Sequence, residues 1–282
     1  MPLLLLPVCA AVVLWAAPQW IFMWGLAVSI YAGLKWLTFA DSAAARNAPL
    51  AGKLSYLFLW CGMNADSFLA GQRETYARPA MREWTLAVAK IALGFSLIYL
   101  AVPQLRQFGT LAVGWTGMVG LAFVLHFGLL HIVSLAWRTA SYNAPPIMNK
   151  PHVSTSLAEF WGKRWNTAFR DLAHRYVFRP VVKRRGLMVA TLAVFVASAF
   201  VHEIVTTPAA GGGYGLPSLY FLLQGTALLF ERSRVGKRWN LGSGVSGRIY
   251  CLIVILAPAV ICFPPAFLEN VTLPMLDAIG VR

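Results

Sequence analysis

Two short stretches hold the residue types that could carry chemistry in this chain, and the sharper one contains a single histidine. In 194-VFVASAFVHEIV-205, His202 lies inside an otherwise apolar segment with helical spacing. An ionisable group inside a bilayer is costly and therefore indicates function. Imidazole can take up a proton near neutral pH. His202 is thus a candidate general base, and the alternative is a histidine that only hydrogen-bonds between packed helices.

Three further residues are candidates for lining a cavity next to this histidine. Ser198 precedes His202 by four residues and shares its helix face. Glu203 points about 100° away and is predicted to anchor a lysine or arginine from another helix. His126 lies in a different apolar segment, where either a structural role or a place in the cavity wall is open.

The second stretch is 156-SLAEFWGKRWNTAF-169, which combines charges, tryptophans and an asparagine. The amide of Asn166 can both donate and accept hydrogen bonds. The lysine and arginines can meet phosphate, and the tryptophans can form a wall for an acyl chain or a base. An ordinary amphipathic membrane anchor explains the same residue types. The candidate residues for binding a phosphorylated cofactor or co-substrate are Trp161, Lys163, Arg164, Trp165 and Arg170.

Metal chemistry has no support in the spacing of the ligand residues. The four cysteines, Cys9, Cys61, Cys251 and Cys262, are scattered and lack metal-site spacing. His126 and His131 are five residues apart and do not share a helix face. We expect no metal and no permanently bound cofactor, and the cysteines are predicted to be small buried apolar side chains.

Composition places these stretches in a membrane protein. Hydrophobic residues make up 59% of the 282 residues and charged residues only 12%, whereas charged residues are about 25% of a soluble domain. The 11 tryptophans and 9 tyrosines fit, because both side chains favour the bilayer interface. The chain is predicted to be an all-α polytopic membrane protein, forming one integral-membrane domain over residues 1–282.

Apolar runs of sufficient length predict seven spans, and one polar segment predicts a surface helix. The spans are expected at about 3–17, 20–40, 86–102, 110–137, 187–205, 214–231 and 247–263. Aromatic residues recur at helical spacing over 156–178, which predicts an amphipathic helix in the cytoplasmic interface.

The basic residues predict the orientation of these spans. The loops 41–84, 138–186 and 232–248 hold five, ten and five basic residues, which is 20 of the 24 in the chain. With seven spans all three loops fall on one side, and the positive-inside rule makes that side cytoplasmic. Asn166 is then expected near the cytoplasmic face and His202 towards the far end of its span. To meet, either the amphipathic segment dips deeply or the fifth span is tilted, broken or shifted.

Several motifs resemble the membrane-bound O-acyltransferase superfamily, and within it the wax synthase branch. They are 60-WCGMNADSFL-69, 145-PPIMNKP-151, 156-SLAEFWGKRWN-166 and 197-ASAFVHE-203, in the order and spacing of that family. The resemblance implies about seven to eight transmembrane helices around a central tunnel. It also implies acyl-CoA as donor, with His202 as the buried histidine and Asn166 as the asparagine of the FWxxRWN-like run.

The function expected from the resemblance is transfer of a fatty acyl group from acyl-CoA to a long-chain alcohol, forming a wax-type ester. A sterol, glycan or secondary-metabolite acceptor is one alternative, and a non-enzymatic lipid transporter is another. Membrane lipids are expected partners and nucleic acid is not. The protein is expected in the cell membrane of a bacterium or in the endoplasmic reticulum of a eukaryote.

Overall fold

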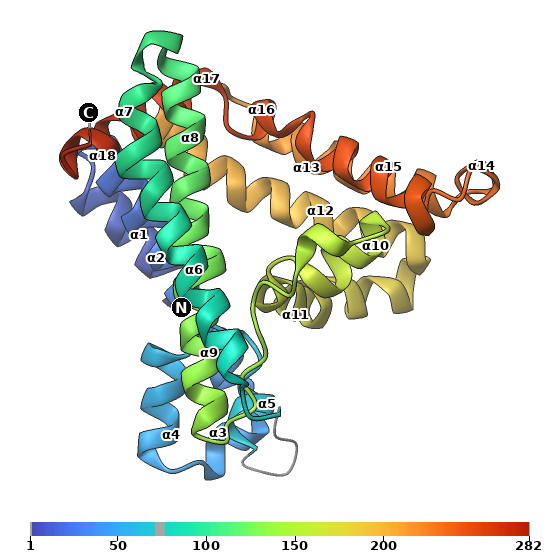
Figure 1. Cartoon of the computed structure of the whole chain (residues 1–282). Coiled ribbons are helices and arrows are strands. Elements are labelled where there is room, and N and C mark those ends of the chain that lie inside the picture. The colour runs from blue at the N-terminus through green and yellow to red at the C-terminus, as the bar shows by residue number, and fades with distance from the viewer. Residues whose placement is uncertain (1, 71–76, 282) are drawn as a thin grey trace. The chain divides into compact units, whose positions relative to one another are not determined.

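The computed structural model describes residues 2–70 and 77–281, and every regular element in them is a helix (Figure 1). The all-α prediction is confirmed. Five helical segments are long and apolar enough to cross a membrane, which confirms a polytopic membrane protein. They are Gln19–Ala40, Met81–Gln104, Thr110–Thr139, Thr167–Ala210 and Gly244–Cys262.

Two of the seven predicted spans form shorter helices. α1 (Pro2–Val13) has 12 residues and α13 (Leu216–Arg232) has 17. At 1.5 Å per residue, α13 is roughly 25 Å long, against about 30 Å for the hydrocarbon layer. Five of the seven predicted spans are therefore long enough to cross a membrane. That α1 and α13 also cross the membrane stays a prediction.

The chain divides into two compact units, of which the first comprises Met1–Met148 and Leu268–Arg282. Its helices are α1, α2 (Gln19–Ala40), α3 (Ala43–Asn47), α4 (Leu50–Leu54), α5 (Ala65–Leu69), α6 (Met81–Ser96), α7 (Val102–Gln104), α8 (Thr110–Ala122), α9 (Leu130–Thr139) and α18 (Leu273–Ala278). π-helical turns η1 (Ser55–Leu59), η3 (Leu97–Ala101), η5 (Phe123–Leu129) and η9 (Leu268–Thr272) and the 3₁₀ turn η4 (Arg106–Phe108) extend or join them.

Close backbone packing and buried polar contacts hold the first unit together. α6 and α8 approach so closely that a Cβ on Gly94 would lie 2.7 Å from the carbonyl oxygen of Gly120, a use of small residues typical of membrane helices. Arg138 of α9 pairs with Glu83 of α6 at 2.7 Å. Lys35 of α2 is 1% exposed and donates to the carbonyl of Gly62, so the WCGMN loop covers a buried ammonium group.

The second unit comprises Asn149–Phe267 and carries both stretches singled out above. Its helices are α10 (Leu157–Glu159), α11 (Thr167–Ala173), α12 (Arg179–Ala210), α13, α14 (Arg234–Arg238), α15 (Gly244–Leu256), α16 (Ala259–Cys262) and α17 (Pro265–Phe267). The 3₁₀ turn η6 (Pro151–Val153) and the π-helical turns η7 (Phe160–Arg164) and η8 (His174–Phe178) complete it.

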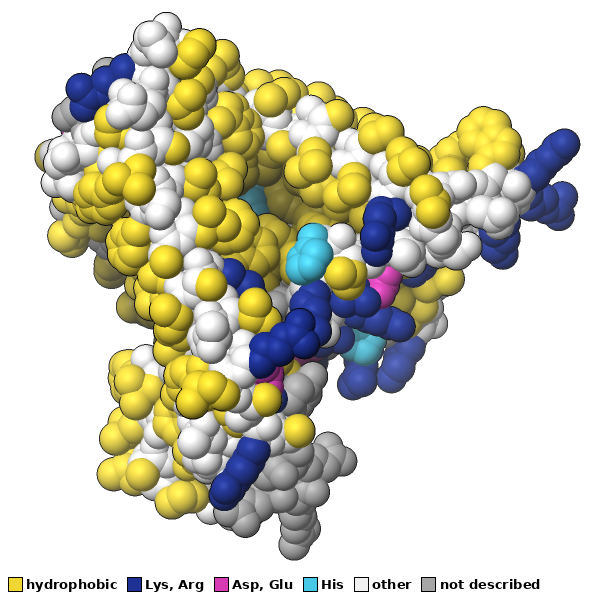
Figure 2. Space-filling model, in the orientation of Figure 1, with side chains coloured by type: hydrophobic (Ala, Val, Ile, Leu, Met, Phe, Trp, Pro, Cys, Tyr) yellow, Lys and Arg dark blue, Asp and Glu magenta, His cyan; other side chains and the backbone are white. Residues whose placement is uncertain are grey.

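The core of this unit lies where α10 and η7 pack against the long helices. It contains Leu157, Phe160, Phe195, Ala199, Tyr220, Phe221, Leu228, Cys251 and Cys262. On the face shown in Figure 2, hydrophobic side chains cover most of α15, whereas lysines and arginines gather over α10 to α12 and at α14. The lysines and arginines of this unit thus gather at two places on its surface.

The structure differs from the predicted continuous helix over 156–178. Helical turns end at Arg164, and α11 starts again at Thr167. Asn166 interrupts the helix, because its backbone is left-handed with φ 40° and ψ 63°, a conformation that asparagine tolerates better than most residues.

α12 also bends, at Gly186. This residue has φ 80° and ψ 176° inside an otherwise helical run, in a region that is essentially restricted to glycine. This bend lies directly before the span predicted at 187–205, so the helix that carries His202 continues unbroken from Leu187.

Candidate acyl-transfer site

His202 lies two turns before the end of α12, and its ring has a defined proton position. Nδ1 is 2.8 Å from the carbonyl oxygen of Ser198, one turn earlier. A carbonyl can only accept, so Nδ1 of the neutral ring carries the proton and Nε2 carries the lone pair. Among the described residues Nδ1 is the one ring nitrogen of His202 with a hydrogen bond. The geometry therefore leaves Nε2 as a base.

Ser198 was predicted to line a cavity beside His202, and the structure shows a contact through its backbone. Its backbone carbonyl, rather than its hydroxyl, fixes the tautomer of His202. Helical spacing alone supplies this contact, since residues four apart lie above one another on a helix.

An aromatic ring from α13 covers the imidazole. The ring centroids of His202 and Phe221 are 4.2 Å apart at an interplanar angle of 40°, and Phe221 is 4% exposed. Packing on one face restricts the rotation of the imidazole, so Nε2 keeps its direction.

Glu203, the next residue along α12, holds the helix that carries this ring. Its carboxylate accepts from the backbone N–H of Gly215 at 2.7 Å and from the N–H and hydroxyl of Ser218 at 3.1 and 2.7 Å. These groups form the N-terminus of α13, which attracts negative charge. Glu203 therefore anchors a helix terminus, whereas the sequence predicted a lysine or arginine partner.

The start of the second stretch is fixed by two carboxylates. Glu231, 4% exposed at the end of α13, accepts from the N–H groups of Leu157 at 2.5 Å and Ala158 at 3.2 Å. Glu159 accepts from Arg164 at 2.5 and 2.8 Å. These bonds fix η7 between α10 and α11.

Trp161 brings this stretch close to the histidine. Its ring meets Phe195 of α12 at 5.8 Å and Phe221 of α13 at 6.0 Å. Phe221 is the residue that covers His202, so Trp161 and the imidazole contact the same ring. Along α12, Phe195 and His202 are seven residues apart, roughly 10 Å. In the FWGKRWN run Phe160 is buried, Trp161 and Trp165 are half-buried and Lys163 is exposed, so the run lies at the surface of the unit with aromatic rings packed inward.

Asn166 follows five residues after Trp161 and forms the N-cap of α11. Its side-chain oxygen accepts from the N–H of Phe169 at 3.3 Å. The NH₂ group is the donor of this side chain, since an amide oxygen only accepts.

The residues proposed for donor binding fall into two groups. Arg164 pairs with Glu159, Arg170 pairs with Asp171 at 2.8 Å, and the ring of Trp165 stacks on Phe160 at 5.4 Å. These three are engaged within the protein, whereas Lys163 is exposed. Lys163 is therefore the member of this set best placed to meet a phosphate from solution.

His126 belongs to the first unit, in η5. Its Nδ1 is buried and has no hydrogen-bond partner among the described residues. Within the described residues no group of three His, Cys, Asp or Glu side chains lies close enough to hold a metal ion.

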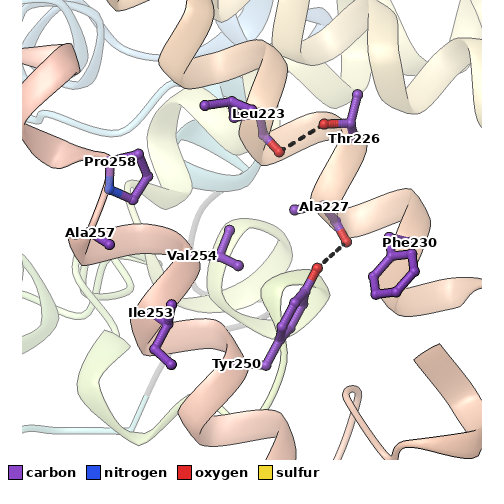
Figure 3. A pocket seen from close by; sticks show the side chains of 9 residues that line it. All are labelled: Leu223, Thr226, Ala227, Phe230, Tyr250, Ile253, Val254, Ala257 and Pro258. Atoms are coloured by element: carbon purple, nitrogen blue, oxygen red, sulfur yellow. Dashed lines mark hydrogen bonds between the residues drawn. The ribbon is translucent and has the colours of Figure 1, made fainter. Parts of the chain in front are cut away.

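A separate groove of about 440 Å³ lies between α13 and α15–α16 (Figure 3). Its lining consists of Leu223, Thr226, Ala227, Phe230, Tyr250, Ile253, Val254, Ala257 and Pro258. The hydroxyl of Tyr250 donates across it to the carbonyl of Ala227 at 2.8 Å. None of the site residues predicted from sequence lines this apolar groove.

Two residues of this neighbourhood, Phe221 and Gln224, were not among the predicted site residues. Gln224 is the single amide in the apolar run of α13 and is fully buried. A lone polar residue in such a run was a readable signal. Phe221 carried no such signal, because its importance comes from the ring that it meets.

Comparison with known proteins links this region to one family. Residues 144–223 match the Membrane bound O-acyl transferase family. The chain is 29% identical over 140 residues to Probable long-chain-alcohol O-fatty-acyltransferase 7 of Arabidopsis thaliana, covering 44% of this chain and 41% of that protein. It is 27% identical over 154 residues to Long-chain-alcohol O-fatty-acyltransferase of Simmondsia chinensis, covering 48% and 41%.

A sterol enzyme is also similar. The chain is 31% identical over 111 residues to Sterol O-acyltransferase 2 of Rattus norvegicus, covering 35% of this chain and 21% of that protein. The aligned parts thus span well under half the length of these relatives. The resemblance to the membrane-bound O-acyltransferase superfamily and its wax synthase branch is confirmed.

Proposed function

We propose, on the premise of this resemblance, that the protein transfers a fatty acyl group from acyl-CoA to the hydroxyl of a lipophilic alcohol. The observation that carries the proposal is the 2.8 Å contact between Nδ1 of His202 and the carbonyl oxygen of Ser198, which assigns the proton to Nδ1 and leaves Nε2 as a base. The family match over 144–223 covers both His202 and Asn166. The names of the plant relatives favour a long-chain alcohol, which makes the product a wax-type ester.

The reaction follows from the two polar groups. Nε2 of His202 takes the hydroxyl proton as the alcohol oxygen attacks the thioester carbonyl carbon. The carbonyl oxygen becomes an oxyanion, to which the amide of Asn166 donates, a contact worth about 2.7–4 kcal/mol in comparable sites. The C–S bond then breaks, the imidazolium returns its proton to the CoA thiolate, and the ester is released.

Donor binding is assigned to the basic side chains over α10 to α12 (Figure 2). Lys163 is exposed there and can meet a CoA phosphate as a point charge. Arg164 and Arg170 act indirectly in this proposal, because their ion pairs with Glu159 and Asp171 shape the segment that carries Asn166. Acyl chain and alcohol are proposed to enter from the surrounding lipid.

A sterol is the second candidate acceptor, and the rat relative named as a sterol acyltransferase favours it. A rigid sterol and a linear alcohol present the same hydroxyl to His202. They differ in the shape of the apolar surface that must receive them, so competition between acceptors distinguishes them. Lipid transport without chemistry is a third outcome that the same preparation can reveal.

The test is acyl transfer by the purified protein in detergent and in vesicles. Labelled acyl-CoA is incubated with a panel of linear alcohols and sterols, and ester formation is measured for the wild type, His202→Ala and Asn166→Ala. We expect ester only with hydroxyl acceptors, a loss of activity in His202→Ala that approaches the uncatalysed rate, and a 10²–10³-fold lower kcat in Asn166→Ala, about the effect of removing one oxyanion donor.

His152→Ala is the matched control, because His152 is an exposed histidine of the same unit. It should transfer acyl groups at the wild-type rate. Undiminished transfer in His202→Ala would overturn the mechanism. Movement of labelled lipid between vesicles without any ester would replace the enzyme proposal by transport.

A further inference from the structure

Pro258 leaves one backbone carbonyl without its helical donor. In an α-helix the carbonyl of Val254 would accept from the N–H four residues later. That residue is Pro258, which has no N–H. The position lies inside the apolar segment Gly244–Cys262, where no water can substitute in a bilayer.

Side chains from α13 replace the missing donors. The amide nitrogen of Gln224 donates to the Val254 carbonyl at 2.7 Å. One turn earlier on α13, the hydroxyl of Tyr220 donates to the Ile255 carbonyl at 3.3 Å. α13 thus satisfies the carbonyls that the proline break exposes.

The other end of the Gln224 amide reaches the FWGKRWN run. Its oxygen accepts from the indole N–H of Trp161 at 3.3 Å, and Gln224 is 0% exposed. An amide donates through nitrogen and accepts through oxygen. A single buried side chain therefore joins the break in α15 to the turn that precedes Asn166.

We propose that Gln224 is a positioning residue that sets the place of the FWGKRWN segment relative to His202. Trp161 contacts Phe221, which covers His202, so the indole bond fixes the segment against the helix pair that holds the histidine. Asn166 is the last residue of the FWGKRWN segment, so the position of this segment also sets the position of Asn166. The consequence for catalysis rests on the proposed acyl transfer, whereas the fixing of the segment does not.

The Val254 carbonyl lacks a backbone donor because Pro258 has no N–H. Substitution of Pro258 therefore allows the two roles of Gln224 to be tested separately. Gln224→Leu removes both bonds and leaves the Val254 carbonyl unpaired. Pro258→Ala restores the backbone donor to that carbonyl, so the double variant Gln224→Leu/Pro258→Ala repairs α15 but not the bond to Trp161. Trp161→Phe removes the indole donor and keeps the bond from Gln224 to α15. Thr226→Val is the control, because the Thr226 hydroxyl bonds only within α13.

Hydrogen–deuterium exchange of the purified proteins gives a readout that does not need activity. We expect peptides within 157–166 to exchange faster in Gln224→Leu, in the double variant and in Trp161→Phe. Peptides within 250–262 should exchange faster in Gln224→Leu alone and return to the wild-type rate in the double variant. Wild-type exchange over 157–166 in all three variants would overturn the proposal.

Kinetics supply the second readout. In the double variant and in Trp161→Phe we expect kcat to fall about 10- to 100-fold, as for a small displacement of a catalytic group, with a smaller change in KM for acyl-CoA. A double variant with wild-type kcat would show that Gln224 serves only to bond the Val254 carbonyl in α15. That result would overturn the positioning role. If the wild type forms no ester, the proposed function fails while the exchange result still decides the position of the segment.

Discussion

Three carboxylates fix segment ends in the unit that contains His202. Glu203 and Glu231 each accept from backbone N–H groups at a helix start, and Glu159 accepts from Thr155 and Arg164. Charged acceptors in such positions form stronger hydrogen bonds than neutral ones. The chain has only ten acidic residues. Three of those in this unit, Glu159, Glu203 and Glu231, form hydrogen bonds that hold neighbouring segments in place.

Glu159 gives a pH dependence at the residue scale. The N–H of Thr155 holds the pKa of Glu159 below its ordinary value of 4.5, and Arg164 lowers that pKa further, against an opposing effect of burial. A lowered folded-state pKa contributes stability above pH 4.5 that is lost as the pH falls through the folded value. Glu159→Gln should therefore unfold at a lower temperature than the wild type at neutral pH, with the gap closing on acidification below 4.5.

Thermal unfolding of both proteins in detergent over this pH range measures the effect. A gap of constant size down to strong acid would contradict it, because the charge of Glu159 would then play no part.

At the scale of elements, two breaks shape the second unit. Asn166 separates η7 from α11, and Gly186 bends α12. Both have positive φ, but they differ in cause, since the side chain of Asn166 caps the following helix whereas Gly186 only supplies backbone freedom.

Replacing Gly186 isolates the cost of its backbone conformation. No atom lies within 4 Å of a Cβ added there, so Gly186→Ala creates no clash. It should destabilise the protein by about 1–3 kcal/mol through φ/ψ strain and reduce acyl transfer by reorienting α11. Gly162→Ala is the control, because Gly162 is equally open but lacks the positive φ. Equal unfolding temperatures for the two variants would rule out a strained bend.

The capping of α13 gives a second prediction at this scale. Glu203→Gln turns one carboxylate oxygen into an NH₂ group, which cannot accept from Gly215 or Ser218. We expect about 1–3 kcal/mol lower stability and a lower kcat, because Phe221 loses its fixed place over His202. Denaturation and ester formation test both, with the exposed Glu269→Gln as control. Wild-type stability in Glu203→Gln would show that α13 starts without this cap.

For the whole molecule, the crossing of α13 decides the topology. The charge pattern predicts that 232–248 and the turn before α13 lie on opposite sides. Single cysteines at Asn240 and Tyr214, both exposed, are placed in a variant lacking Cys9, Cys61, Cys251 and Cys262. A membrane-impermeant maleimide should label the first from the cytoplasmic side and the second from the opposite side. Labelling of both from one side would show that the short α13 does not cross.

The sequence by itself determined the class of the protein and its candidate catalytic residues. Apolar runs and helical spacing are local properties, so an all-α membrane protein could be predicted from composition and confirmed. His202 and Asn166 were likewise selected by residue type, surroundings and family resemblance, and their shared role stays a prediction.

Only the tertiary structure decided what holds these residues in place. Glu231 meets Leu157 across 74 positions and Gln224 meets Trp161 across 63, and no local periodicity encodes such pairs. The contacts of Phe221 with both Trp161 and His202 are likewise made between segments that are distant in sequence. The reason is physical: buried polar groups in a membrane must find partners within the protein, and those partners come from whichever helix packs beside them.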